Sequence, residues 1–382
     1  MKIALVYPKY TTHGGMERFV FNFSKQLLEM GHDVHLIVGK IEVPVDKRIT
    51  VYKAPIIKLG GCLKVLSFLW FSQQVLKKHQ FDIIQGFGRT IRQDVFRAGG
   101  GCYKELRKHV LQKIKNPLLR YFKLYQPYQF LLLSIEKKQF STGNFKKIVA
   151  VSNQVKKEII LNYGVPDADI EVIHNGVDTK TFHPHNKERY FGEVRKKFNI
   201  KMEEKVILFL GTGFARKGLS FLMKSFALIK NNHPDTKLLV VGKDNNIQRY
   251  IRLSKELSLF DRVIFTGPQS EVKKFYALAD IFVFPTLYEP FGNVCLEAMA
   301  SGLPVVTSKI NGASEIMEGM DYLLLDDPTD IKILSAKIGF LLANNNERRK
   351  IAGAVRSIAE HYTISNNARK FVSLYESILK PP

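Results

Sequence analysis

Residues 284–304 read FPTLYEPFGNVCLEAMASGLP, and this stretch decides the fold. An apolar run over Ile281–Pro285 predicts a strand, and Pro304–Thr307 predicts the next one. Between them Gly292-Asn293 can start a helix, which we expect over Val294–Ser301. A strand, a helix and a second strand in this order form the repeating unit of a parallel sheet covered by helices. This part of the chain is therefore expected to be an α/β domain.

The same alternation extends in both directions along the chain. Short apolar or β-branched runs predict strands at Ile3–Tyr7, Val34–Val38, Ile49–Tyr52, Ile83–Gln85, Ile148–Val151, Glu171–Ile173, Val206–Leu210, Lys237–Val241, Arg262–Thr266, Ile281–Pro285, Pro304–Thr307 and Tyr322–Leu325. Amphipathic stretches predict helices at Met16–Met30, Cys62–Lys78, Ser220–Asn231, Ile247–Leu257, Glu271–Leu278 and Val294–Ser301. The predicted fold class is α/β, with two doubly wound Rossmann-like halves in series.

The boundary between the halves is expected near His174–Asp178, where Asn, Gly and Asp supply turn chemistry. At 382 residues the chain exceeds what one hydrophobic core usually organises, which favours two domains. We expect an acceptor-side domain over residues 1–175 and a nucleotide-binding domain over residues 176–364. The last helix, residues 365–379, is expected to pack back on the first domain.

Two glutamates in the opening stretch suggest binding chemistry. Glu289 follows a predicted strand, and Glu297 falls about one turn inside the predicted helix, so both carboxylates can face one crevice. Carboxylates accept charge-assisted hydrogen bonds from sugar or ribose hydroxyls, and backbone amides at residues 291–294 can receive phosphate or sugar oxygens. The alternative interpretation is that one glutamate is satisfied by hydrogen bonds in the first turn of the helix and that the other lies on the surface.

A glycine-rich loop with two cations follows the first strand of the second half. Residues 211–218 place Arg216 and Lys217 at the carboxyl edge of a parallel sheet, where phosphates bind. The two outer glycines of Gly213–Gly218 have the spacing of a P-loop, but Leu219 occupies the position of its lysine, which disfavours a nucleotide hydrolase. The alternative is that both cations are solvated surface charges.

Gly14-Gly15 follows the first predicted strand and precedes the helix expected from Met16, so backbone N–H groups at a helix start could face an anion. An ordinary tight turn is the alternative. The pair is not the Gly-x-Gly-x-x-Gly fingerprint of dinucleotide binding, and no such fingerprint follows another predicted strand. The sequence therefore argues against hydride chemistry.

The net charge of +23 indicates an anionic partner. Tyr103–Lys138 carries nine Lys/Arg and two Glu, interleaved with aromatic residues. Such a segment suits an anionic membrane surface, because rings lie at headgroup depth while Lys and Arg meet anionic lipid. A solvated basic helix face is the alternative. Nucleic acid is not expected as a partner, because the chain contains no recognisable nucleic-acid motif.

Several simpler signals bound the location and chemistry of the protein. No apolar run approaches the ~20 residues that span a bilayer, and Pro8 interrupts the first run before a signal peptide could develop, so a cytoplasmic protein is expected. The three cysteines, Cys62, Cys102 and Cys295, are expected to be reduced core thiols. Asp167-Ala168-Asp169 precedes a predicted strand and is interpreted as a turn rather than a metal clamp.

Together these motifs resemble the retaining nucleotide-sugar glycosyltransferases of family four, which have the GT-B fold of two Rossmann-like domains facing each other across a cleft. The resemblance covers nearly the whole chain. It implies that Glu289 contacts the transferred hexose, that Glu297 contacts the ribose, and that Arg216 and Lys217 hold the diphosphate. Glu289, Arg216 and Lys217 are the implied catalytic residues. The other implied donor-binding residues are Gly14, Gly15, Gly213, Phe291, Gly292, Asn293 and Val294, with the base near Thr266–Gln269.

Within the family the chain most resembles the lipopolysaccharide core glucosyltransferases, through Gly14–Arg18, Gly86-Phe87, Asp94–Phe96, Ala98 and Cys102–Glu105. This likeness implies UDP-glucose as donor, a lipid-linked glycan such as the lipopolysaccharide core as acceptor, and docking on the inner face of the cytoplasmic membrane through Tyr103–Lys138. Those enzymes carry an acidic residue where this chain has Gly100, so no first-domain catalytic side chain is assigned. Arg18 and Gly100 are the implied acceptor-side positions.

No metal and no cofactor are expected, because two cations, loop amides and a helix start can stabilise a departing nucleoside diphosphate. The family retains anomeric configuration, which is compatible with front-face attack in which the leaving phosphate takes the acceptor's proton. Three alternatives remain open. They are a glycosyltransferase for another glycolipid or a soluble acceptor, a sugar-nucleotide epimerase of the same fold, and a basic binding protein without catalysis.

Overall fold

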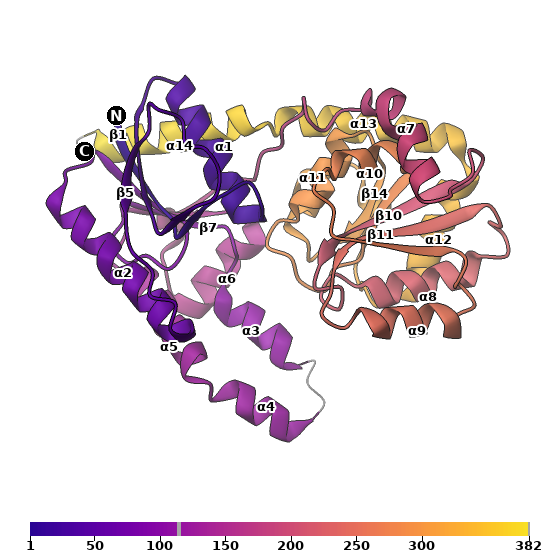
Figure 1. The fold of residues 1–382 in the computed structure, drawn as a ribbon, viewed down its shortest axis with the longest axis horizontal. Coiled ribbons are helices and arrows are strands. Elements are labelled where there is room, and N and C mark those ends of the chain that lie inside the picture. Colours follow the sequence, from indigo (N-terminus) through magenta and orange to yellow (C-terminus); the bar gives the residue numbers. More distant parts are fainter. Residues whose placement is uncertain (113–115, 381–382) are drawn as a thin grey trace. The chain divides into compact units, whose positions relative to one another are not determined.

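The structure is a computed structural model that describes residues 1–112 and 116–380. The chain forms two compact units (Figure 1). One comprises residues 1–174 together with the C-terminal residues from Ile364 onward, and the other comprises Asn175–Thr363. Each unit is built on its own parallel sheet with helices around it, so the predicted pair of α/β Rossmann-like domains is confirmed.

The N-terminal unit contains seven strands, all parallel, in the order β5-β3-β1-β6-β7-β8-β9. From β1 the chain first adds strands on one side and then, from β6 onward, on the other, so the switch point lies between β1 and β6. Residues Ile3–Val6 of the central strand are at most 1% exposed, as expected of a strand covered on both faces. The strands are β1 (Lys2–Val6), β3 (Asp33–Val38), β5 (Thr50–Lys53), β6 (Ile83–Gly86), β7 (Val95–Ala98), β8 (Lys147–Ala150) and β9 (Ile170–Val172), while β2 (Lys9–Tyr10) pairs with β4 (Lys40–Ile41) separately.

The last helix of the chain packs on this unit. Phe371 of the last helix lies against Phe23 of the first, with ring centroids 5.0 Å apart, and the Tyr375 hydroxyl donates to Gln85 Oε1 at 2.8 Å. Both rings are buried in the main core of the unit. The helices are α1 (Gly15–Glu29), α2 (Gly60–Lys78), α3 (Tyr103–Gln112), α4 (Pro117–Leu124), α5 (Pro127–Gln139), α6 (Asn153–Tyr163) and α14 (Ile364–Leu379).

The C-terminal unit contains six strands, all parallel, in the order β12-β11-β10-β13-β14-β15. Its switch point, where the order of strand addition reverses, lies between β10 and β13. The strands are β10 (Lys205–Thr212), β11 (Thr236–Lys243), β12 (Val263–Gly267), β13 (Ile281–Phe284), β14 (Val305–Ser308) and β15 (Leu324–Leu325). The helices are α7 (Asn186–Lys197), α8 (Leu219–Ile229), α9 (Ile247–Glu256), α10 (Lys273–Leu278), α11 (Asn293–Ala300), α12 (Ile331–Ala343) and α13 (Asn345–His361). Helices α7, α12 and α13 are additions to the predicted set.

Three local predictions need correction. Strand β7 was not expected, because Arg97 interrupts its apolar pattern. The strand predicted at Tyr322–Leu325 is only two residues long, because Asp321–Leu323 forms a 3-10 turn before it. All three cysteines are free, but Cys62 is half-buried near the exposed start of α2, whereas the other two are buried as expected. The predicted turn at Asp167–Asp169 is present as one turn of 3-10 helix before β9.

Candidate active site

The switch point of the C-terminal sheet lies between the neighbouring strands β10 and β13, and a loop follows each of these strands at its carboxyl end. In doubly wound sheets, ligands bind outside the carboxyl ends of the strands at such a point. The loop after β10 carries Arg216 and Lys217, and the loop after β13 carries Glu289. The fold therefore brings the two predicted cations and the first predicted carboxylate to one edge of one sheet.

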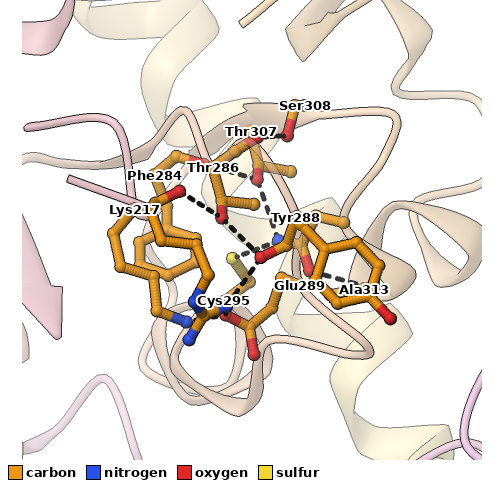
Figure 2. A network of polar contacts seen from close by, with 11 residues as sticks. Lys217, Phe284, Thr286, Tyr288, Glu289, Cys295, Thr307, Ser308 and Ala313 are labelled. Carbon is orange, nitrogen blue, oxygen red and sulfur yellow. Dashed lines mark hydrogen bonds and ion pairs between the residues drawn. The ribbon is translucent and has the colours of Figure 1, made fainter. Parts of the chain in front are cut away.

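Glu289 joins the two cations. Its Oε2 lies 2.9 Å from Arg216 Nη1 and in direct contact with Lys217 Nζ, and Figure 2 shows the Lys217 and Glu289 side chains directed toward one another. Arg216 Nη1 also donates to the carbonyl oxygen of Tyr288 at 2.6 Å. The Lys217 ammonium lies 4.9 Å from the centroid of the Phe284 ring. One carboxylate thus faces two cations, which leaves this loop pair with a net positive charge.

Lys217 is the more buried cation, with 10% of its side chain exposed against 31% for Arg216. Burial, together with the nearby Arg216 guanidinium, lowers the pKa of Lys217 well below its ordinary value. The Glu289 carboxylate opposes this effect, because an adjacent negative charge favours the ammonium form. A diphosphate can take the same part, since it offers anionic oxygens to both cations.

Short polar side chains hold the loop that carries Glu289 (Figure 2). Their hydrogen bonds are Thr286 Oγ1 to the carbonyl oxygens of Arg216 (3.1 Å) and Tyr288 (3.2 Å), Ser308 Oγ to Thr286 O (2.5 Å), Thr307 Oγ1 to Phe284 O (2.7 Å), and Asn311 Nδ2 to Thr307 Oγ1 (2.9 Å) and Cys295 Sγ (3.2 Å). Thr286, Thr307, Ser308 and Asn311 are fully buried. A buried network with such partners fixes its loop in one conformation, so Glu289 is pre-positioned.

The helix predicted to start near Gly292 is α11. Gly292 precedes it with φ 78°, and a Cβ there would lie 2.4 Å from Asn311 Oδ1, so only glycine fits. Asn293 Oδ1 accepts a hydrogen bond from Asn175 Nδ2 at 2.6 Å. Phe291 is buried, and Val294 is half-buried. Four of the residues predicted for donor binding, Phe291 to Val294, thus lie at or next to the start of α11, after the loop that carries Glu289.

Glu297 lies in the second turn of α11 and is only 3% exposed. Its Oε2 accepts a hydrogen bond from the Tyr276 hydroxyl at 3.0 Å. The neighbouring Cys295 is a neutral thiol, because burial raises its pKa to about 12. The position of Glu297 is therefore fixed from α10, and its contact with a ribose stays a prediction. The same holds for the base, since Gln269 in the Thr266–Gln269 loop donates to the carbonyl of Thr266 at 2.9 Å.

Gly218 ends the cation loop under two constraints. Its φ is 78°, and a Cβ would lie 1.9 Å from the carbonyl oxygen of Pro285, whereas Gly213 has φ 75° and no heavy atom within 4 Å of its Cβ position. We expect Gly213→Ala to cost ~1 kcal/mol of unfolding free energy through backbone strain alone, and Gly218→Ala to cost more, about 3 kcal/mol. Urea unfolding of both variants measures this difference, and equal losses would contradict the predicted clash.

The first turn of α1 holds an acidic residue that the sequence analysis missed. The helix begins at Gly15, with Gly14 before it at φ 103°. A Cβ on Gly14 would lie 2.3 Å from Glu17 Oε2, and the Tyr7 hydroxyl donates to Glu17 Oε1 at 3.3 Å. A carboxylate of the chain itself thus lies at this positive helix end. The part of Gly14 and Gly15 in donor binding stays a prediction.

A second missed residue is Arg97, which lies in β7 and is 2% exposed. Its guanidinium stacks 3.6 Å from the centroid of the Phe19 ring, and its Nη1 donates to Met16 Sδ at 3.1 Å. Burial lowers the pKa of Arg97 to about 9. The signal in the sequence was an arginine inside an otherwise apolar strand. Of the predicted acceptor-side positions, Arg18 is half-buried in α1, and Gly100 lies in the loop that follows β7 with open space around its Cβ position.

The basic aromatic segment Tyr103–Lys138 forms α3, α4 and most of α5, and its residues 113–115 lie outside the described part of the chain. The buried Glu136 ties α5 to α3, because it accepts hydrogen bonds from the backbone amides of Tyr103 at 2.6 Å and Lys104 at 3.0 Å. Figure 1 shows α4 at the outer end of this set. Large apolar side chains of the segment are exposed, namely Val110, Leu118, Tyr121, Phe122, Tyr125, Tyr128 and Phe130.

Metal sites and membrane-spanning helices are both absent from the described residues. No group of three or more His, Cys, Asp or Glu side chains there is arranged to hold a metal ion. Asp167 pairs with Lys156 at 2.9 Å and Asp169 with Lys147 at 3.9 Å. Within residues 1–112 and 116–380, no helix has the length and apolar character needed to cross a bilayer.

Comparison with known proteins identifies relatives of both units. The lipopolysaccharide glucosyltransferase WaaG of Escherichia coli K12 is 26% identical over 317 residues, which cover 82% of this chain and 81% of WaaG. An uncharacterized glycosyltransferase of Methanocaldococcus jannaschii is 26% identical over 389 residues, covering 98% of each chain. The second alignment therefore spans both units of this chain.

Solved structures share the fold. The crystal structure of WaaG matches with a TM-score of 0.81 at 22% identity, over 98% of this chain and 99% of WaaG. Anabaena HepE in complex with UDP-glucose matches with a TM-score of 0.73 at 17% identity, over 99% of this chain and all of HepE. Residues 13–181 match the model of Glycosyltransferase Family 4, and residues 191–357 match that of Glycosyl transferases group 1. The chain is therefore a glycosyltransferase of the GT-B type, with a family 4 domain followed by a group 1 domain.

Proposed function

We propose that this glycosyltransferase transfers glucose from UDP-glucose to a lipid-linked glycan, with retention of anomeric configuration. The observation that carries the proposal is the contact of one carboxylate, Glu289, with Arg216 and Lys217 at the switch point of the C-terminal sheet. These side chains suit the two parts of a nucleotide-sugar, a hexose with hydroxyl donors and a diphosphate with anionic oxygens. The name of WaaG and the UDP-glucose complex of HepE support the choice of donor and acceptor.

In this mechanism the donor diphosphate replaces Glu289 as the partner of the cations. Burying the Glu289 carboxylate with Arg216 and Lys217 costs desolvation free energy. An incoming diphosphate then exchanges one anionic partner of the cations for another. Glu289 is then released to accept hydrogen bonds from hydroxyls of the transferred sugar. Donor binding and sugar recognition are thereby coupled through the same three side chains.

The bond from the sugar to the diphosphate breaks as the acceptor oxygen attacks. Negative charge develops on the leaving diphosphate, and Arg216, Lys217 and the amides at the start of α11 are arranged to stabilise it in advance. The proposal requires no metal ion, because fixed cations supply this stabilisation. A departing phosphate oxygen on the attacked face takes the acceptor proton, and Glu289 positions the sugar instead of attacking it.

We propose that the enzyme acts at the surface of an anionic membrane. Tyr121 and Phe122 of α4 are 57% and 63% exposed, which is unusual for large rings in water. Lys104, Lys108, Lys137 and Lys138 are exposed on α3 and α5 of the same set. Rings that enter the headgroup region and lysines that meet anionic lipid together give reversible binding.

Transfer of labelled glucose from UDP-glucose to truncated core lipopolysaccharide tests the proposed function. We expect a glycolipid product with the α-anomer retained and full activity in the presence of a metal chelator. No transfer from any of several nucleotide-sugars to any lipid-linked acceptor would refute the proposal. Transfer to soluble glycans alone would favour the soluble-acceptor enzyme, and loss of donor without any acceptor would favour the epimerase.

A double substitution, Tyr121→Ser with Phe122→Ser, tests the membrane surface. We expect it to weaken binding to phosphatidylglycerol vesicles by about 30–1,000-fold, because each of the two rings contributes on the order of 1–2 kcal/mol when it leaves water. Vesicle co-sedimentation measures the loss. Leu161→Ser is a matched control, because Leu161 is 84% exposed on α6 outside the segment. An equal loss with the control would contradict a specific role of α4.

A further inference from the structure

A pocket of about 660 Å³ opens on the N-terminal unit between α3, α5 and the end of α6. It belongs to one unit alone, and none of its residues lies in the Arg216, Lys217 and Glu289 cluster. Lys104 and Arg107 of α3 line it, as does Lys137 of α5. Tyr163, the last residue of α6, also lines it. The proposed transfer reaction does not explain why these side chains converge.

The charge of the pocket is entirely positive. Its lining contains three cations and no Asp or Glu. Among the described residues, Lys104, Arg107 and Lys137 form no ion pair, whereas the neighbouring Lys108 pairs with Glu105 at 3.5 Å. Two acids contact lining residues from outside the pocket. Glu136 accepts from the amides of residues 103 and 104 and from the Tyr163 hydroxyl, and Glu105 accepts from Asn162 Nδ2 at 3.0 Å and pairs with Lys108. Three cations without an ion-pair partner thus line one cavity against two carboxylates that are already hydrogen-bonded elsewhere, which favours an anion in the pocket.

Arg107 adds a second observation. Its Nη2 donates to the carbonyl oxygen of Leu124 at 2.7 Å, which fixes the guanidinium. Its Nε is buried and has no hydrogen-bond acceptor within the described residues. Because this Nε is shielded from solvent, Arg107 can reach a ligand in the pocket only through the other atoms of its side chain, which lines the cavity. The fixed fork of an arginine matches the oxygens of a phosphate.

We propose that this pocket binds a phosphate group, as a second anion site that is separate from the donor diphosphate site. The three cations supply charge-assisted hydrogen bonds to the phosphate oxygens. Leu133, Phe140 and Val165 also line the pocket and provide an apolar wall, which suits a phosphate attached to a larger organic group. Two sources present this chemistry, the headgroup of an anionic lipid and a phosphorylated sugar of the acceptor.

The test compares Lys137→Glu with Lys138→Glu in the full-length protein. Both lysines are exposed on α5 and the charge change is the same, but only Lys137 lines the pocket. With UDP present to saturate the donor site, equilibrium dialysis measures binding of radiolabelled orthophosphate. We expect Lys137→Glu to weaken this binding by about tenfold or more, and Lys138→Glu to leave it within about twofold.

Two soluble probes then distinguish the sources. Tighter, Lys137-dependent binding of dihexanoylphosphatidylglycerol assigns the pocket to a lipid headgroup, and tighter, Lys137-dependent binding of glucose 6-phosphate assigns it to a phosphorylated glycan. Equal effects of the two substitutions on every probe, or no binding to the wild type, would overturn the proposal. UDP binding measured on the same samples reports the donor site independently, so failure here does not bear on the proposed transfer reaction.

Discussion

Replacing Lys217 with methionine is expected to reduce the rate of sugar transfer by about 10²–10³-fold, because the leaving diphosphate then loses a preorganised cation. Methionine keeps most of the apolar stem but lacks the ammonium, which lies 4.9 Å from the centroid of the Phe284 ring, so the loss reports charge rather than shape. Radiometric transfer under saturating donor measures the rate, and UDP affinity measured by calorimetry is expected to fall by about tenfold or more. Lys224→Met, at an exposed position of helix α8 away from the two loops, is the control.

The pH dependence gives this prediction a second readout. Burial lowers the pKa of Lys217, so the free enzyme loses this charge at a lower pH than an ordinary lysine would. Because the diphosphate binds the protonated form, UDP affinity of the wild type is expected to fall as pH rises through that lowered pKa. The Lys217→Met variant lacks this titration, and its UDP affinity is expected to stay flat over the same range. A wild-type affinity that rises with pH there would contradict the assignment.

Much of the candidate active site was predictable from the sequence, because its parts obey local rules. Gly292 marks a helix start, apolar runs mark β10 and β13, and parallel strands bring their carboxyl ends to one edge. The direct contact of Glu289 with Arg216 was not predicted. These two residues are 73 positions apart in the sequence, and each was assigned a separate ligand contact, the diphosphate for Arg216 and the sugar for Glu289. Only the placement of β10 beside β13 shows that both cations share one carboxylate.

The N-terminal unit was harder to predict because its polar groups depend on packing. Arg97 looked like an interruption of a strand, and only the fold shows it buried against Phe19. Residues 103–138 were treated as one basic surface. The structure separates them into exposed rings on α4 and a pocket that needs Tyr163 from α6 to complete it. Sequence periodicity does not carry that information, because it describes one helix at a time.

Replacing Glu289 with glutamine is expected to change two measurements in opposite directions. Sugar transfer falls by about 10²-fold, because a neutral amide forms weaker hydrogen bonds with the transferred sugar than a carboxylate does. Binding of UDP, which has no sugar, becomes tighter by about tenfold, because Arg216 and Lys217 no longer have a competing anion. Radiometric transfer and calorimetry with UDP measure the two effects.

Glu297→Gln provides the comparison for this sign change. Glu297 is buried in the same helix-loop unit and bonded to Tyr276, but neither Arg216 nor Lys217 pairs with it. Its substitution is expected to weaken UDP binding, since the proposed partner of this carboxylate is the ribose. Tighter UDP binding in Glu289→Gln and weaker binding in Glu297→Gln would together require that Glu289 competes with the diphosphate. If both substitutions weakened UDP binding, Glu289 would instead help to hold the nucleotide, and the exchange of anions at Lys217 would be wrong.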